Sequence, residues 1–421
     1  MRRTIKFLFP LAALCLLAAE PAHATNGMNM IGYSIRSSGM GGADVAVDSD
    51  CSGAACNPAT LGGLQDDSMA LGMSLLMPQL SFSQEAAGAD VDGRDQYFPL
   101  PYLAYARKPD PSSPWTLGVD LFAQGGMGVD VRDYPTPGGP GSFDSLVRYG
   151  RLTMAANYSL NDRLSLGAGV MVGYADIEFS LFPEYPGGIA VDDLSSFGYA
   201  GRVGLHYRFS DTLSFGFQYT SEAALDMEDG TLTANYGPGG TVTFDAEMED
   251  FTWPREAEAG FAYHPLPRLL IAGDIKWIDW SDAIDTVKVR TRGGPAGVPA
   301  PVSPGSDALV FAMNWQDQWV FALGLEYIIN ERHTIRAGYN YGKSPVPDDS
   351  LSPLFPAIVE HHLTLGYRFS AGNWGVDLAF EHAFANSQTN HTADPAKNPF
   401  GPGITVEHDQ NTLHCSISYF F

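Results

Sequence analysis

From Ser68 to the C-terminus, apolar and polar positions alternate in runs that are separated by breaks. Alternation with a period of two predicts β-strands that carry one apolar face. Fourteen runs are predicted to be strands: 68–83, 97–108, 114–124, 147–160, 163–180, 196–209, 212–227, 242–264, 268–290, 309–328, 332–342, 358–369, 373–386 and 405–421.

The breaks between these strands alternate between tight and long. The tight breaks are residues 109–113, 161–162, 210–211, 265–267, 329–331 and 370–372. The others are long and rich in Gly, Pro, Asp and Ser, as in 125–146, 291–308 and 387–404. Short turns at one end and long loops at the other are typical of an outer-membrane barrel. A soluble β-sandwich would lack this alternation.

The two faces of the predicted strands differ in polarity. In "SFGYAGRVGLHYRFS", one face carries Phe197, Tyr199, Val203, Leu205 and Tyr207, and the other carries Arg202, His206 and Arg208. Lipid outside and a hydrated lumen inside require this apolar-out, polar-in arrangement. A lipocalin-like soluble barrel would invert it. The sequence therefore predicts an all-β fold, a 14-stranded antiparallel transmembrane β-barrel over residues 68–421.

The last predicted strand, "TLHCSISYFF", ends in an aromatic residue. That ending resembles the signal read by the barrel assembly machinery of the outer membrane, which we expect as a partner during biogenesis. Cys415 lies on the lipid-facing side of this strand, where a free cysteine behaves as a small apolar residue.

The N-terminus reads as a cleavable leader, residues 1–24. A basic start (Arg2, Arg3, Lys6) precedes the uncharged apolar run 7–19, and Ala22-His23-Ala24 supplies a small-x-small cleavage site. The run is too short for a membrane anchor. A lipoprotein signal at Cys15 is disfavoured because Leu14 is the wrong preceding residue.

Charge limits the partners. Removing the leader leaves 21 basic and 47 acidic residues, so the formal net charge moves from −24 to −26. Such a chain repels nucleic acid, and we expect no nucleic-acid partner. No later segment has eighteen consecutive apolar residues, so the sequence predicts no transmembrane helix.

Residues 25–67 precede the first strand and are rich in Gly and Ala. A fourteen-stranded barrel leaves an aqueous channel unless something fills it. We therefore expect this segment to lie inside the barrel as a hatch. Cys51 and Cys56 are five positions apart, and export favours a disulfide between them. A metal pair is the alternative, but no His or further Cys lies nearby, so we expect neither a metal nor a cofactor.

Three stretches carry a family resemblance. They are "TNGMNMIGYSIRSSGMGGADVAVDSD" with the following Asn57-Pro58-Ala59, then "AGDIKWIDWSDAIDTVKV" (272–289), and "IRAGYNYGKSPVPDDS…PLFPAIVEHHLTLGYRF" (335–369). Together they resemble the FadL/TodX (OMPP1) family of outer-membrane transporters for long-chain fatty acids and other hydrophobic compounds. The tripeptide matches the NPA motif of the family's hatch.

The resemblance implies a mechanism. Family members capture hydrophobic molecules among the extracellular loops and pass them to a pocket in the barrel. Movement of the hatch N-terminus then releases them sideways through the wall, at a kink in the third strand. In this chain Gly125-Gly126 fits such a kink, because Gly permits unusual backbone angles. An ordinary loop start is the alternative.

Candidate ligand contacts follow from the substrate class. A fatty acid needs an apolar tunnel and a cation for its carboxylate. Met28, Met30, Ile31 and Tyr33 are the expected apolar contacts, although residues on the surface of a buried plug give the same pattern. Arg151 and Arg336 are the leading cations, with Arg202, Arg208, Lys276 and Arg368 also expected in the lumen. These cations could instead pair with lumenal acids and brace the hatch.

The expected function is passive uptake of hydrophobic molecules, foremost long-chain fatty acids, by a monomer in outer-membrane lipid of a Gram-negative bacterium. Aromatic hydrocarbons are the alternative substrates. An outer-membrane enzyme is disfavoured because the histidines are scattered and no G-x-S-x-G element is present. A general porin is disfavoured by the hatch.

Overall fold

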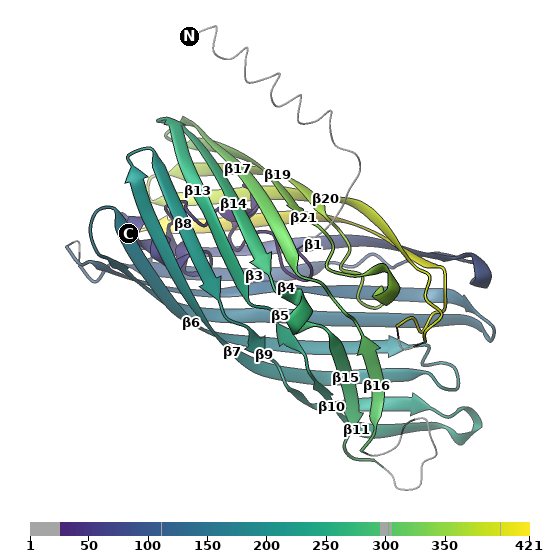
Figure 1. Ribbon diagram of the computed structural model, residues 1–421. Helices are drawn as coiled ribbons and strands as arrows, with labels where there is room; N and C mark the ends of the chain where they lie inside the picture. The colour runs from purple at the N-terminus through teal and green to yellow at the C-terminus, as the bar shows by residue number, and fades with distance from the viewer. Residues whose placement is uncertain (1–25, 111, 295–301, 303–304, 396) are drawn as a thin grey trace.

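The computed structural model describes residues 26–110, 112–294, 302, 305–395 and 397–421 of the chain. The expected leader lies outside these residues. The described chain forms a closed antiparallel β-barrel, because β1 pairs with β21 along their whole lengths, from Ser68 opposite Phe420 onwards (Figure 1). No helix within the described ranges is both long enough and apolar enough to cross a membrane.

Fourteen strands make up the wall in the described residues. Ten are continuous: β1 (Ser68–Gln84), β3 (Phe98–Arg107), β4 (Trp115–Thr136), β5 (Gly139–Ser159), β6 (Leu164–Leu181), β7 (Ile189–Ser210), β18 (His333–Gly342), β19 (His361–Ala371), β20 (Trp374–Asn390) and β21 (Ile404–Phe420). The short β2 (Ala89–Asp92) folds back onto the long-loop end of β1.

The other four wall strands are built from pieces. They are β8–β10 (Leu213–Thr220, Ala223–Ala224, Met227–Asn235), β11–β13 (Thr241–Glu249, Thr252–Trp253, Glu256–Leu266), β14–β15 (Leu269–Ile278, Thr286–Thr291) with the helical turn α3 (Trp280–Ala283) between them, and β16–β17 (Asp307–Ala312, Gln318–Asn330). The outer pieces β10, β11, β15 and β16 pair with one another and project together at the lower right of Figure 1.

The expected strand faces and tight turns are present. Along β17, Leu323 and Leu325 are exposed on the outer surface, whereas Glu326 is buried in the lumen. Because side chains alternate along a strand, this arrangement gives lipid an apolar surface and the lumen a polar one. The tight turns join β7 to β8, β13 to β14, β17 to β18 and β19 to β20 through two residues each.

The expected long loop 125–146 is mostly strand, which corrects the sequence prediction. β4 runs on to Thr136 and β5 starts at Gly139, and the two pair up to Thr136 opposite Gly139. The glycines and prolines of this stretch suggested a loop. A two-stranded ribbon absorbs them because Gly is compatible with a β-bulge.

The four interrupted strands switch the residues that face the lumen. On the tight-turn side of its break, β8 turns Gln218 and Thr220 inward. Beyond the break, Ala223, Leu225 and Met227 are the buried residues. A shift of one position in the alternation moves the apolar set to the opposite face. The lumen is consequently polar near the tight turns and apolar towards the long loops.

Residues 26–67, called the hatch below, lie inside the barrel. They contain the short helices α2 (Ile35–Ser38), η1 (Cys51–Ala54) and η2 (Pro58–Gly63). Most of their side chains are buried. Hatch side chains bond to several wall strands, as in the Tyr33 hydroxyl to Glu256 of β13 and Arg36 to Glu326 of β17.

Candidate functional site

Glycines of the wall bring the middle of the hatch into backbone contact with the barrel. A Cβ atom at Gly338 of β18 would collide with the backbone of Met40 and Gly41, and one at Gly204 of β7 would collide with the Asn57 side chain. Because Gly alone permits such close approach, these positions seat the hatch tightly. Similar positions are Gly167, Gly216, Gly324 and Gly366.

The expected hatch motif lies against β6 and β7. The Asn57 amide donates to the carbonyl oxygens of Val45 (2.7 Å) and Leu205 (3.2 Å), and its Oδ1 accepts from the Ala59 amide at 3.0 Å. Pro58 occupies the first turn of η2, where its fixed φ suits the helix. The motif therefore anchors the hatch to the wall and is not at the kinked third strand.

The expected disulfide is absent, since Cys51 and Cys56 are free, buried thiols. Cys51 begins the turn η1 and Cys56 follows it. A turn of 3₁₀-helix carries residues five positions apart to different sides, whereas a disulfide needs Cα atoms within about 7 Å. Burial raises the pKa of both thiols, so they are protonated at neutral pH. The short sequence spacing was therefore a misleading signal.

The third wall strand, β4, separates from β3 part of the way along. Their pairing ends with Tyr102 opposite Phe122, although β3 continues to Phe98. A β-bulge follows in β4 between Ala123 and Gly125. Gly126 has φ +149°, a conformation that L side chains rarely adopt. A gap thus opens between β3 and β4 next to the glycine pair singled out in the sequence.

The start of the hatch occupies the inner side of this gap. The Met30 amide donates to the Gln124 carbonyl at 3.0 Å, and the Gly126 amide donates to the Met28 carbonyl at 3.0 Å. Asn29 forms a β-bridge with Gly125. Hatch residues 28–30 therefore pair with β4 at the point where β4 leaves β3.

Asn29 fastens this segment to the wall through its side chain. Its Oδ1 accepts from Gln124 Nε2 and from Trp253 Nε1, each at 3.0 Å, and its Nδ2 donates to Glu256 Oε1 at 2.9 Å. The Tyr33 hydroxyl donates to the same carboxylate at 3.0 Å. One hatch side chain thus connects β4, β12 and β13.

The cations expected to bind a carboxylate have other partners. Arg151 stacks on the Tyr33 ring at 4.6 Å and donates to Gln124 Oε1 at 2.6 Å. Arg336 bonds to Glu326 and to Asp377, each at 2.6 Å. These contacts match the alternative in which lumenal charges brace the hatch and the wall.

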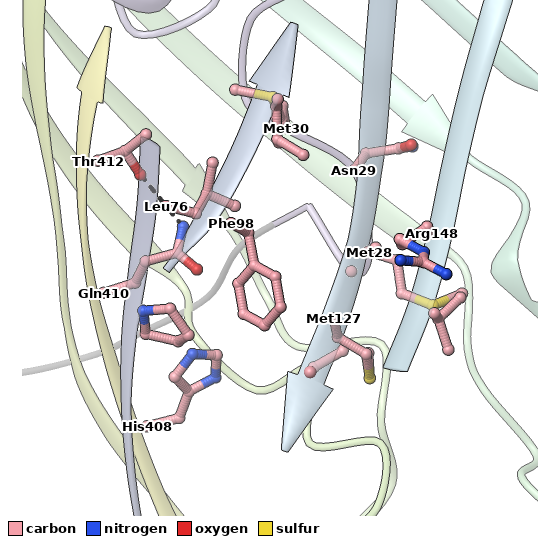
Figure 2. A pocket seen from close by; sticks show the side chains of 18 of the residues that line it. Met28, Asn29, Met30, Leu76, Phe98, Met127, Arg148, His408, Gln410 and Thr412 are labelled. Atoms are coloured by element: carbon pink, nitrogen blue, oxygen red, sulfur yellow. Dashed lines mark hydrogen bonds between the residues drawn. The ribbon is translucent and has the colours of Figure 1, made fainter. Parts of the chain in front are cut away.

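A cavity lies beside the gap. Met28, Met30 and Ile31 line it as expected, whereas Tyr33 is not among its lining residues. The wall contributes Leu76, Leu80, Phe98, Leu100 and Met127 on one side and Glu381, His408, Gln410 and Thr412 on the other. Figure 2 shows the Phe98 ring between the β21 side chains and Met127.

This cavity reaches both faces of the wall. Val147 of β5 is buried in the lumen, and its neighbours Leu146 and Arg148 lie on the opposite face of the strand. All three line the cavity. Arg148 is held on the outer surface by an ion pair with Asp176. The cavity therefore opens sideways where β4 bends away from β3.

A second cavity is lined by Met, aliphatic and aromatic side chains. It shares Met28 and Val147 with the first cavity, so the two adjoin. The interrupted strands supply much of its lining: Met248, Phe251, Ile284, Phe311, Met313 and Trp315. These side chains point inward because of the switch in strand alternation.

An open groove lies among the long loops. Its lining combines aromatic rings with Pro and Gly: Tyr134, Phe182, Tyr185, Phe400, Pro135, Pro186 and Pro402 are among its residues. An apolar groove at this end offers a first contact for a hydrophobic molecule.

Sequence reasoning missed Asn29, Phe98 and His408. Period-two alternation places Phe98 and His408 on the inner face of their strands, so their direction could have been predicted. Their shared cavity could not, because it depends on the gap in the wall. Asn29 stood inside the quoted hatch stretch but carried no signal of its own.

Comparison with protein families gives one match over nearly the whole chain. The model described as "Outer membrane protein transport protein (OMPP1/FadL/TodX)" covers residues 15–421. A curated protein of Chlorobium limicola, described as an uncharacterized protein in the phosphoenolpyruvate carboxykinase gene 5′ region, is 42% identical over 116 residues, or 27% of this chain. The chain spans about half (54%) of that relative's length.

Several solved structures have the same fold. The Pseudomonas putida toluene transporter TodX is 21% identical with a TM-score of 0.76, over 94% of this chain and 100% of that one. The Ralstonia pickettii toluene transporter TbuX is 21% identical with a TM-score of 0.69, over 93% of this chain and 99% of that one. A Pseudomonas aeruginosa FadL homologue is 16% identical with a TM-score of 0.77, over 94% of this chain and 100% of that one.

Proposed function

The chain belongs to the outer membrane protein transport family (OMPP1/FadL/TodX), and from this membership we propose that it imports hydrophobic molecules and releases them sideways through the β3–β4 gap. It is an outer-membrane protein. The observation that carries the proposal is the cavity lined from both faces of β5, by Val147 inside and by Leu146 and Arg148 outside.

The proposed route has three stages. A molecule first settles in the groove among the long loops, next to Phe182 and Phe400. It then enters the two adjoining cavities above the hatch. It leaves through the wall when residues 28–30 withdraw from β4. A sideways exit suits a hydrophobic molecule because it passes from an apolar cavity into lipid without crossing water.

An uncharged substrate fits this route better than a fatty-acid anion. An ionised carboxylate in an apolar site needs a cationic partner. Arg151 and Arg336 are engaged with the hatch and the wall, and neither lines the cavities. TodX and TbuX, which share this fold, are described as toluene transporters. Fatty acids remain the second candidate, through the FadL homologue of similar fold.

A glycine replacement at the gap tests the exit. A side chain at Gly128 would extend into the Phe98 ring and into the cavity. We expect Gly128→Leu to reduce uptake of radiolabelled toluene at least tenfold at equal surface abundance. Gly150→Leu is the matched control, because Gly150 also lies in the wall but its Cβ would have room, with the nearest atom at 3.7 Å. Wild-type uptake by Gly128→Leu would refute the proposed exit.

A further inference from the structure

A strip of polar side chains lines one side of the first cavity, the one beside the β3–β4 gap. His408, Gln410 and Thr412 face inward at alternate positions of β21, and Glu381 of β20 lies beside them. Burial of a polar group is unfavourable unless it forms a hydrogen bond. A cavity for hydrocarbons alone would not require this strip, so its bonding partners matter.

Most of the strip is satisfied by the protein itself. Gln410 Nε2 donates to Thr412 Oγ1 at 3.3 Å. The two carboxylate oxygens of Glu381 bond to His362 Nδ1 at 2.7 Å and to His414 Nε2 at 3.2 Å. These groups therefore need nothing from a ligand.

His408 is different. Its side chain is buried, with 9% of the residue exposed. Its Nδ1 lies 3.1 Å from the carbonyl oxygen of Pro356. A carbonyl oxygen only accepts, so Nδ1 carries the ring proton. In the neutral ring Nε2 then holds a lone pair and acts as an acceptor. Within the described residues, Nε2 has no hydrogen-bond partner and is itself buried, so a ligand in the cavity reaches it only when the ring or a neighbouring side chain shifts.

We propose that His408 Nε2 accepts a hydrogen bond from a hydroxyl group of the transported molecule. The inference rests on the proposed function, because it takes this cavity as the transport site. The substrate class is then an uncharged hydrophobic compound that carries an O–H donor: a phenol, an alcohol or a carboxylic acid in its protonated form.

The charges around the cavity support an uncharged ligand. The Glu381 carboxylate lines the same cavity and would repel an anion. Arg148, the cation among the lining residues, is ion-paired with Asp176 at 2.5 Å on the outer surface. A hydroxyl can meet the acceptor on His408 without placing a second negative charge next to Glu381.

Toluene and two of its derivatives distinguish binding through an O–H donor from binding through an oxygen atom that only accepts. Toluene has no oxygen, p-cresol has a hydroxyl, and 4-methylanisole has an ether oxygen that only accepts. Affinity is measured by equilibrium competition on the purified full chain in detergent, with each compound's partition into detergent subtracted. We expect the wild type to bind p-cresol about three- to tenfold more tightly than 4-methylanisole, the range of one hydrogen bond.

Two variants locate the effect. His408→Phe should bind p-cresol and 4-methylanisole equally, and heat-resistant migration of the variant in detergent gels shows that its barrel is folded. His382→Phe is the matched control, since His382 lies on the adjacent strand outside the cavity and bonds to Asn411. It should keep the wild-type preference. Equal binding by the wild type, or a preference that survives in His408→Phe, would overturn the inference and leave the proposed function standing.

A pH series with dodecanoic acid distinguishes the possible sources of the hydroxyl. If the protonated acid is a ligand, its binding should fall as pH rises through the acid's pKa, while p-cresol binding stays constant to about pH 9. Tighter binding of the ionised acid would mean a cationic site and would overturn the inference. Absence of binding by all of these compounds, together with absent toluene uptake, would overturn the proposed function as well.

Discussion

The start and the middle of the hatch are attached to the barrel to different extents. Residues 39–61, the anchored part, contact the wall backbone at glycines such as Gly338 and Gly204. Residues 26–33, the N-terminal arm, pair with the backbone of β4 through Met28, Asn29 and Met30, and the Asn29 side chain adds three hydrogen bonds to the wall. Met28 of the arm also borders both cavities.

This difference indicates which part of the hatch can move. The anchored part meets wall glycines on five strands, from β6 to β18, so it cannot shift without displacing the wall, whereas the arm has one such contact, at Gly125 of β4. The arm has cavity volume beside it and is held by polar bonds that water can replace. Motion of the arm alone would open the β3–β4 gap while the lumen stays closed. The predictions below test each half of this contrast.

The largest effect is expected where the anchored part is displaced. In Gly338→Val the new side chain collides with the backbone of Met40 and Gly41, which cannot rotate away. Overpacking of this kind costs about 1–3 kcal/mol. We expect the hatch to loosen and ion conductance in planar bilayers to rise well above the wild-type level. Gly201→Val is the control, because the nearest atom to its Cβ would lie 4.0 Å away. Wild-type conductance in Gly338→Val would contradict the anchoring role.

A smaller effect is expected when the arm is released. Asn29→Ala removes three hydrogen bonds and takes away the acceptor of the buried Trp253 Nε1, at a cost of roughly 1–3 kcal/mol, while Gln124 Nε2 keeps its longer bonds to Tyr33 and Glu256. Hydrogen exchange should accelerate at residues 28–30 and stay unchanged at residues 39–61, with no gain in conductance. Asn57→Ala sharpens the comparison, because exchange should accelerate around Val45 and Ala59 instead. Equal acceleration throughout the hatch in both variants would show that its two parts are not independent.

Reductant is expected to have almost no effect on the labelling of Cys51 and Cys56. Cys51 and Cys56 are buried thiols whose pKa is raised by burial. A raised pKa keeps the thiol protonated and unreactive at pH values up to its ordinary titration range. Maleimide should therefore leave both residues unmodified in the folded protein at pH 7, and it should label both after unfolding without reductant. Labelling that required reductant would reveal a disulfide.

Much of the barrel could be predicted from the sequence because each wall strand meets lipid on one side and the lumen on the other. That difference imposes the period-two pattern by which Tyr199 and Val203 were assigned to the outer surface, where both are exposed. The pattern also located the tight turns. The breaks in strands seven to ten were missed because each half of the predicted strand 268–290 alternates normally. Only its phase changes, around the helical turn Trp280–Ala283.

The candidate site was predicted less completely. Gly125 and Gly126 drew attention because Gly permits a bulge, and a bulge lies there. The role of Arg151 could not be decided, since its partners come from the hatch and from a neighbouring strand. His408 was missed for a similar reason, because its lone acceptor depends on Pro356, 52 positions away along the chain.

Photolabelling tests the sideways exit most directly. A toluene analogue that carries a diazirine is bound to the protein in lipid vesicles and photolysed, and the labelled residues are identified by mass spectrometry. The sideways route predicts labels on Leu146 and Arg148, on the outer face of β5, in addition to Met28 and Val147 inside. A separate pocket within the hatch is lined by Arg36, Met40 and Asp44. The sideways route would be contradicted by labels on these three residues and none on Leu146 or Arg148, a result that would indicate a route through the hatch.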